Sequence, residues 1–173
     1  MRFAPILLLL ATPLASCVAT PSARPEAALF DPAADAQAAY AAARARSVES
    51  GRPLLAVLGA NWCHDSRALA GWLETPRFRQ LVAADFELVF VDVDHPQAGE
   101  GRNLEIPRQF GIDGLQSTPA LLVIAPDGTL LNRASATGWG NAASRSGDAI
   151  YAEIARYARV HERDRTGVIE NTP

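Results

Sequence analysis

The chain has 173 residues, of which 49% are hydrophobic and 20% charged, and its formal net charge is -3. These values are typical of one globular domain and argue against a broad basic surface for nucleic acid. All 16 basic residues are arginines, which excludes Schiff-base catalysis by lysine, lysine-linked PLP and a P-loop lysine. Two cysteines and three histidines are too few and too scattered for a zinc framework, so we expect neither a metal nor a bound cofactor.

The N-terminus has the pattern of a secretory signal. Arg2 supplies a positive charge, residues 3–14 form an apolar run, and small residues follow. The run is too short to cross a bilayer, which takes about 20 apolar residues. We therefore predict a signal peptide over residues 1–16 and exclude it from the fold.

The end of this signal is more specific. The tetrapeptide Leu-Ala-Ser-Cys at 14–17 resembles a bacterial lipobox, whose cysteine becomes the lipidated first residue of the mature protein. The sequence therefore predicts lipidation of Cys17 and attachment to a membrane of the bacterial envelope, facing the periplasm. Val18 is not the aspartate that resembles an inner-membrane retention signal, so the outer membrane is favoured. The alternative is an ordinary signal cut near Ala15, with Cys17 incidental.

The predicted elements begin after a tether. Residues 17–30, with many Ala, Pro, Ser and Thr residues, have the composition of a flexible linker that starts at the lipid. Asp31-Pro32 is typical of a helix start, and one helix is predicted from there to Ser50, closed by Gly51. The later elements are strands over 53–59, 86–94, 120–124 and 129–133, and helices over 64–73, after Pro76, over 105–110 and over 148–163. Loops are expected over 95–103 and 134–147, and a loose tail over 164–173.

This order predicts an α/β fold for residues 31–163. The first two strands alternate with helices, which indicates a parallel βαβ unit. The sequence Pro-Asp-Gly-Thr at 126–129 is a turn that joins the last two strands into a hairpin. We therefore expect a central mixed β-sheet flanked by helices on both faces.

Cys63 is the candidate nucleophile. It follows a predicted buried strand and opens a predicted helix, where free backbone N–H groups and the helix dipole favour the thiolate, the species that attacks disulfides. A protonated His64 would favour the thiolate further, whereas the Asp65 carboxylate would oppose it. If Cys17 carries lipid, Cys63 is the one thiol left in an oxidising compartment, which indicates a reactive or intermolecular role.

At these residues the sequence resembles the thioredoxin-like family. The resemblance rests on Trp-Cys-His-Asp-Ser at 62–66, a strand-to-helix junction, and on Thr118-Pro119 before an apolar strand. It covers about residues 50–133 closely. It implies a thioredoxin-like fold and a cis peptide bond at Thr118-Pro119, which faces Cys63. In such proteins the backbone beside the proline pairs with an extended substrate, so Thr118 and Pro119 are the expected substrate-binding residues.

The chain departs from the family pattern in three places. Ser66 stands where a second, resolving cysteine is usual, so Cys63 can form a mixed disulfide but cannot close an internal one. Release then needs an outside thiol or another cysteine of the substrate, and the second route is disulfide isomerisation. Val57 stands where the family has a buried aspartate that assists the resolving cysteine, and the loop 113–117 is slightly longer than in thioredoxin. Ser66 is expected to hydrogen-bond the Cys63 thiolate.

The favoured hypothesis is a lipid-anchored envelope protein that exchanges disulfides through Cys63. Ser66 and His64 would tune the sulfur, and Trp62 would shape the substrate surface. The expected partners are cysteine-containing envelope proteins or small thiols, without nucleic acid. One alternative is a redox-inactive module that holds a partner protein or extended peptide in the groove beside Pro119. A second is a glutathione-linked monothiol enzyme, or one with an iron–sulfur cluster between two subunits.

Other polar residues are expected to have no role in chemistry. His95 has the position of a surface residue, and Asp92 and Asp94 end a strand without a visible acid–base partner. Trp139, between two glycines, is typical of a loop anchor. A metal role for His64 is not expected, because no other histidine or cysteine lies near the Cys63 motif in the sequence.

Overall fold

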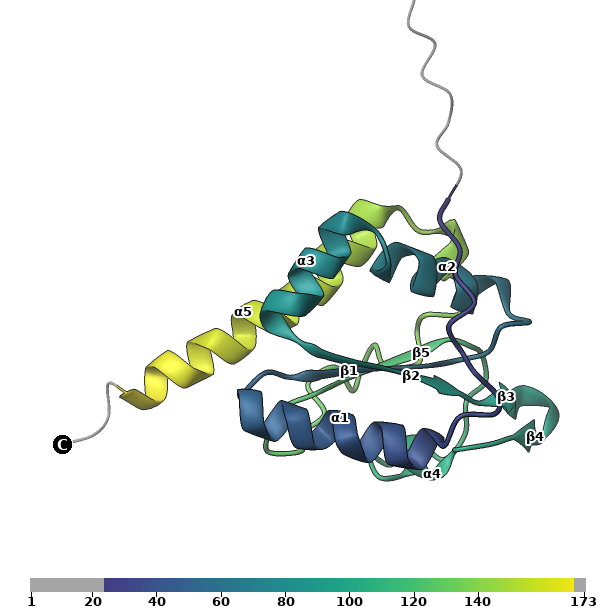
Figure 1. Cartoon of the computed structure of the whole chain (residues 1–173), viewed down its shortest axis with the longest axis horizontal. Coiled ribbons are helices and arrows are strands. Elements are labelled where there is room, and N and C mark those ends of the chain that lie inside the picture. Colours follow the sequence, from purple (N-terminus) through teal and green to yellow (C-terminus); the bar gives the residue numbers. More distant parts are fainter. Residues whose placement is uncertain (1–23, 170–173) are drawn as a thin grey trace, which may run out of the picture.

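The computed structural model describes residues 24–169, with side chains as far as residue 158. Its centre is a three-stranded sheet with the strand order β2-β1-β5 (Figure 1). β1 (Leu54–Gly59) is parallel to β2 (Glu87–Asp92) and antiparallel to β5 (Ala120–Ile124). The predicted mixed sheet and its parallel unit are therefore confirmed.

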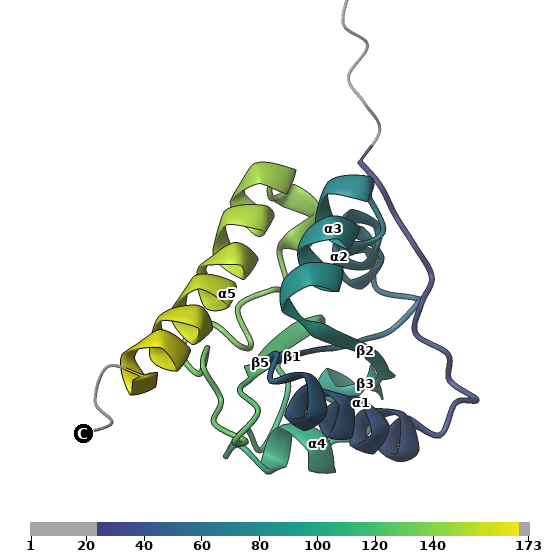
Figure 2. The same cartoon turned by 60° about the vertical axis from the view of Figure 1, so that its left-hand side comes forward.

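Helices cover both faces of this sheet (Figure 1 and Figure 2). α1 (Ala36–Ser50) and the short α4 (Glu105–Arg108) lie on one face, and α2 (His64–Leu73), α3 (Pro76–Asp85) and α5 (Gly147–Ile169) lie on the other. β1 is buried along its whole length, and its side chains alternate between the two helical layers. Burial on both sides explains why its sequence is a continuous apolar run.

α1 begins later than the sequence predicts. The Asp35 carboxylate, and not that of Asp31, caps the helix by accepting a hydrogen bond from the Ala38 amide at 2.9 Å. Asp31 instead closes a turn before the helix, where it accepts from the Ala33 amide at 2.9 Å. Asp31 is followed by the proline that favours a helix start, so the local sequence points to the wrong aspartate. Gly51 follows the helix with φ 67°, as predicted.

The predicted strand over 129–133 is wrong. Beside β5 the chain makes an isolated bridge at Leu130 and continues as turns, in which the Leu131 amide still donates to the Val123 carbonyl at 2.8 Å. The Asn132 side chain takes over the pairing, because its Nδ2 donates to the Leu121 carbonyl at 2.7 Å and its Oδ1 accepts from the Val123 amide at 2.8 Å. One buried side-chain amide thus satisfies backbone groups of β5 that a fourth strand would otherwise pair.

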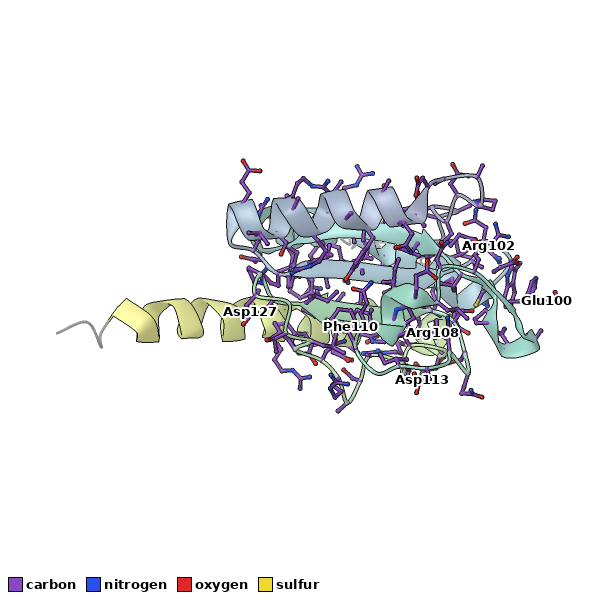
Figure 3. The ribbon with its side chains drawn as sticks, turned by 90° about the horizontal axis from the view of Figure 1, so that it is seen from below. Glu100, Arg102, Arg108, Phe110, Asp113 and Asp127 are labelled. Carbon is purple, nitrogen blue, oxygen red and sulfur yellow. The ribbon has the colours of Figure 1, made fainter. Side chains whose placement is uncertain are left out.

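β2 ends at Asp92, and a small hairpin follows where the sequence predicts the strand end and a loop. Its strands are β3 (Asp94–His95) and β4 (Glu100–Gly101), with the one-turn helix η1 (Pro96–Ala98) between them. This polar stretch holds the proline and glycine that a tight reversal favours. In Figure 3 the hairpin lies at the right-hand end of the molecule, where Glu100 is labelled.

Residues 24–30, called the strap below, are not the flexible tether that the sequence predicts. Phe30 is fully buried, with 0% of its surface exposed, in the core between the sheet and α2. From there the strap runs along α2 (Figure 1), where the Ala27 amide donates to the Arg67 carbonyl at 3.0 Å. The rest of the predicted signal peptide and tether, including Cys17, lies outside the described residues.

The C-terminal part also differs from the prediction. The loop before α5 contains the 3-10 helix η2 (Ala142–Ser144), and Trp139 beside it is 1% exposed, as expected for a loop anchor. α5 continues to Ile169, so the loose tail predicted from residue 164 is wrong as far as residue 169. Among the described residues, no helix has both the length and the apolar character needed to cross a membrane.

Candidate functional site

Cys63 lies at the N-terminal end of α2, after the turn that leaves β1. Its amide donates to the Ala60 carbonyl at 3.1 Å, and its backbone is extended where the helix begins, with φ -81° and ψ 121°. The thiol is free, and the residue is 8% exposed. Its Sγ donates a hydrogen bond to the Thr118 carbonyl at 3.3 Å. The fold thus brings together the two motifs on which the family resemblance rests.

The Thr118-Pro119 peptide bond is cis, which confirms the expectation from the family resemblance. It immediately precedes β5, so the sheet fixes its position beside Cys63. Thr118 is 3% exposed, and its hydroxyl has no hydrogen-bond partner among the described residues. A neighbouring loop packs closely on this turn, because a Cβ at Gly140 would lie 2.6 Å from Ser117 Oγ.

Ser66, at the position of the missing resolving cysteine, is fully buried. Its hydroxyl has no hydrogen-bond partner in the described part of the chain, so it does not bond the sulfur of the thiol, and the bond to the thiolate stays a prediction. The Cys63 thiol donates to Thr118 instead. Ser66 faces Gly59 at the end of β1, where a Cβ would lie 2.7 Å from both Ser66 Oγ and Phe30 Cζ. The glycine therefore makes room for the strap and the serine together.

The interior beneath Ser66 is apolar. Val57 is fully buried, and its register partner on β2 is Phe90. The Phe90 ring meets the ring of Phe30 edge-on, with 5.5 Å between their centroids. Val57 therefore offers no proton-transfer group below α2, which agrees with the absence of a resolving cysteine above it.

Trp62 forms the exposed surface beside Cys63. It is 44% exposed, and its ring stacks on that of His95 with 4.2 Å between centroids and 11° between planes. The indole Nε1 donates to the Asp94 carbonyl at 3.2 Å. Sequence reasoning missed His95, because nothing in its local sequence indicates that the β3–β4 hairpin folds back onto Trp62.

A charged network anchors that hairpin. Arg102 pairs with the carboxylates of Asp92 and Asp94, and the Asp94 amide donates to Asp92 at 3.2 Å. Burial raises the pKa of Asp92, and the Arg102 guanidinium opposes this rise. Asp94 has φ 53°, a left-handed conformation that is uncommon outside glycine. Asp92 and Asp94 thus support the surface beside the thiol through Arg102.

His64 is held from the strap. Its Nε2 lies 2.9 Å from one carboxylate oxygen of Glu26, and the other oxygen accepts from Arg67 Nε at 2.9 Å. The Arg67 guanidinium also donates to the carbonyls of Asn61 and Trp62, at 2.9 and 3.2 Å. The hydrogen bond from Arg67, followed by the charges of Arg67 and His64, lowers the pKa of Glu26. Sequence reasoning missed Glu26 and Arg67, although Arg67 lies one helical turn after Cys63.

The remaining polar side chain of the motif is engaged elsewhere. The Asp65 carboxylate accepts a hydrogen bond from the Ala143 amide of η2 at 2.8 Å. It thereby ties α2 to the loop before α5. Within residues 24–158, no group of three or more His, Cys, Asp or Glu side chains could hold a metal ion.

Comparisons with known proteins find one family and one solved structure. A family described as thioredoxin-like matches residues 35–126. The crystal structure of a disulphide isomerase from Xylella fastidiosa Temecula1 is 34% identical to this chain, covers 73% of it and 94% of its own length, and has a TM-score of 0.64. No curated protein matches the chain. The family match begins after the strap, so Glu26 and Phe30 lie outside it.

Proposed function

Because the chain belongs to the thioredoxin-like family, we propose that it is a thiol–disulfide exchange protein that acts through Cys63. The observation that carries the proposal is a free thiol at the start of α2, 3.3 Å from the carbonyl that precedes a cis-proline. The start of a helix favours the thiolate, which is the attacking species. The similarity to a structure described as a disulphide isomerase supports this chemistry.

The first step is attack on a substrate disulfide. The Cys63 thiol loses its proton to solvent, and its hydrogen bond to the Thr118 carbonyl ends. The thiolate then forms an S–S bond with one substrate sulfur while the substrate's own S–S bond breaks. The second substrate sulfur leaves as a thiolate and takes a proton from solvent. One disulfide replaces another, so no outside oxidant or reductant is needed.

The second step distinguishes isomerisation from reduction. With Ser66 at the resolving position, the chain cannot close an internal disulfide to expel the substrate. Another thiol of the substrate attacks the mixed disulfide instead, which forms a new substrate disulfide and regenerates the Cys63 thiolate. This cycle rearranges disulfides without net oxidation. A small external thiol can also release the substrate: it attacks the Cys63 sulfur and forms a disulfide with it, and the substrate sulfur leaves as a thiolate. A second small thiol then attacks this disulfide, which regenerates the Cys63 thiolate and forms the disulfide of the two small thiols.

The neighbouring residues have separate roles in this proposal. Thr118 and Pro119 present backbone to an extended substrate segment beside the sulfur. The exposed indole of Trp62 covers apolar substrate surface. A protonated His64 favours the thiolate through its charge. Ser66, whose hydroxyl has no partner among the described residues in the thiol form, is available to donate to the sulfur once the thiolate forms.

We also propose that the protein works in the bacterial envelope as a lipoprotein. The signal pattern over residues 1–16 and the lipobox-like residues ending at Cys17 support this location. Val18 favours the outer membrane, with the domain facing the periplasm. An oxidising compartment supplies the cysteine-containing proteins that a single reactive thiol would engage. Small thiols are the other expected partners, and no nucleic acid is.

The test is to trap substrates as mixed disulfides. The full chain is produced in a bacterial host, free thiols are blocked with acid and alkylating agent, and membranes are analysed on diagonal non-reducing and reducing gels. We expect the natural chain to retain partner proteins, because it has no thiol to expel them. Cys63→Ser should lose every adduct. The matched variant Ser66→Cys should release most of them, because it adds a resolving thiol one helical turn from Cys63.

Other outcomes would identify the alternatives. If Cys63→Ser keeps the same partners in a non-covalent pull-down and the natural chain forms no adducts, the protein is a binding module. If adducts form with glutathione alone, the monothiol alternative holds. Cys17→Ser should move the protein and its adducts from the membrane fraction to the soluble fraction, and an unchanged membrane fraction would contradict the lipid anchor.

A further inference from the structure

The strap is joined to the turn that carries Cys63. The Asn61 side chain binds the backbone of Phe30 on both sides, donating to its carbonyl at 2.7 Å and accepting from its amide at 3.0 Å. The Ala27 amide binds the Arg67 carbonyl. Glu26 adds the contacts to His64 and Arg67. The strap therefore touches the active turn before and after the cysteine.

We propose that Glu26 is a positioning residue for the reaction of Cys63, which it influences by fixing the side chain of His64, the residue that directly follows the cysteine. The proposal rests on the proposed function, because it concerns the rate at which Cys63 attacks a disulfide. Glu26 lies outside the matched family region of residues 35–126, so the family pattern does not supply it. It belongs to the segment that sequence composition assigns to a linker.

The geometry gives the carboxylate two simultaneous partners. One oxygen lies 2.9 Å from His64 Nε2, and the other accepts from Arg67 Nε at the same distance. Arg67 in turn holds the carbonyls of Asn61 and Trp62, which directly precede Cys63. Arg67 thus fixes the Glu26 carboxylate relative to the turn that carries Cys63. The carboxylate then fixes the exposed imidazole of His64.

The exposed fractions of the two side chains distinguish a positioning role of Glu26 from a role in folding. The side chains of His64 and Glu26 are 66% and 39% exposed, so their pair adds little to folding. The strap also has its own anchors, the buried ring of Phe30 and the bonds to Asn61. Loss of the Glu26 charge should therefore leave the fold in place. It should release the His64 side chain, which when protonated favours the neighbouring thiolate through its charge.

The test measures the second-order rate of Cys63 with 4,4′-dithiodipyridine between pH 3 and pH 8. The full chain carries Cys17→Ser, so that Cys63 is the one thiol. We expect Glu26→Gln to slow the reaction at pH 6 by up to about fivefold, the rate equivalent of the strongest exposed ion pairs. Glu74→Gln is the matched control, because Glu74 also pairs with an exposed arginine, Arg79, at the far end of α2. It should leave the rate unchanged, and both variants should melt like the parent chain.

Two further readouts exclude a merely structural effect. In a His64→Asn background, Glu26→Gln should no longer slow the reaction. The charged groups in contact with His64 among the described residues are Glu26 and, through it, Arg67. Because the pKa of Glu26 is lowered, the difference between parent and Glu26→Gln should persist through pH 5 and shrink only well below pH 4.5, where Glu26 becomes neutral.

Two results would overturn the proposal. One is an unchanged rate in Glu26→Gln, and the other is an equal slowing with and without His64. Failure of the proposed function would differ from both, because Cys63 of the folded parent chain would then react only after unfolding. That result would overturn the exchange function and the role of Glu26 together.

Discussion

Two segments hold the two neighbours of Cys63, and they do so by different means. The strap holds His64 on one side, and the β3–β4 hairpin holds Trp62 on the other. The strap is anchored by a fully buried ring, Phe30, and by paired hydrogen bonds to Asn61. The hairpin is anchored by charges and by a stack of two exposed rings.

This difference separates a segment of the core from a surface addition. Phe30 shares a core cluster with β1, α2 and α5, so the strap contributes to the folding of the whole domain. His95 and Trp62 are both substantially exposed, so the hairpin can change with little effect on folding. Substitutions on the strap should therefore change stability most, and those on the hairpin should change substrate preference most.

The largest effect is expected for Phe30→Ala. Removal of a fully buried aromatic ring, which fills the space above Gly59, should lower the free energy of unfolding by about 3–5 kcal/mol. Urea denaturation followed by circular dichroism measures this change. Leu29→Ala is the matched control, because Leu29 is 37% exposed and should lose less than about 1 kcal/mol. Equal losses in the two variants would mean that the strap is not part of the core.

A smaller, pH-dependent effect is expected for Asp92→Asn. Burial raises the pKa of Asp92 above 3.8, so ionisation of this carboxyl disfavours the folded state. The contribution of Asp92 to the free energy of unfolding therefore falls as pH rises above 3.8. The asparagine does not titrate, so the stability of the variant relative to the parent chain should increase as pH rises over that interval. Urea denaturation at pH 3.5 and pH 7 measures the difference.

Asp127 provides the control of opposite sign. It lies far from Arg102 in Figure 3, and hydrogen bonds from Thr129 lower its pKa. The stabilisation by Asp127 is present above its unfolded pKa and is lost as pH falls. The free energy of unfolding of Asp127→Asn should therefore fall relative to that of the parent chain as pH rises. Parallel pH profiles for the two variants would contradict the assigned pKa directions.

The smallest effect on folding is expected for His95→Ala. Loss of an exposed ring stack should change the free energy of unfolding by about 0.5 kcal/mol. The reaction of Cys63 with a peptide disulfide that has an aromatic residue beside the cysteine should slow, because the Trp62 ring loses its support. The reaction with 4,4′-dithiodipyridine should stay unchanged. His95→Phe should restore the peptide rate, and equal slowing with both disulfides would argue against a role in substrate preference.

The central part of the fold could be predicted because its signals are local. The apolar run of β1, the turn to α2 at Cys63 and the Thr118-Pro119 pair before β5 are each visible within a few residues. A continuous apolar run between turn residues indicates a strand buried on both faces. The placement of Cys63 against Thr118 then followed from the family resemblance and not from periodicity.

The rest depends on non-local fits. The composition of residues 24–30 is that of a linker, and the strap is ordered because Phe30 fits the space left by Gly59, which is distant in sequence. The predicted fourth strand fails because the side chain of Asn132 replaces backbone pairing with β5. His95 reaches Trp62 only through a hairpin that follows the reversal at Asp94. None of these contacts has a periodic signal in the sequence.

The course of the strap also limits the reach of the thiol. The backbone of Pro25 packs against Gly71 in the last turn of α2, whereas Cys63 stands at the first turn, about 12 Å away along the helix. The chain between Cys17 and Arg24, fully extended, spans at most about 25 Å. With a lipid on Cys17, the sulfur would work within about 40 Å of the bilayer. Such a short distance would make location a determinant of substrate selection, because proteins that emerge at or assemble on the same membrane would be favoured.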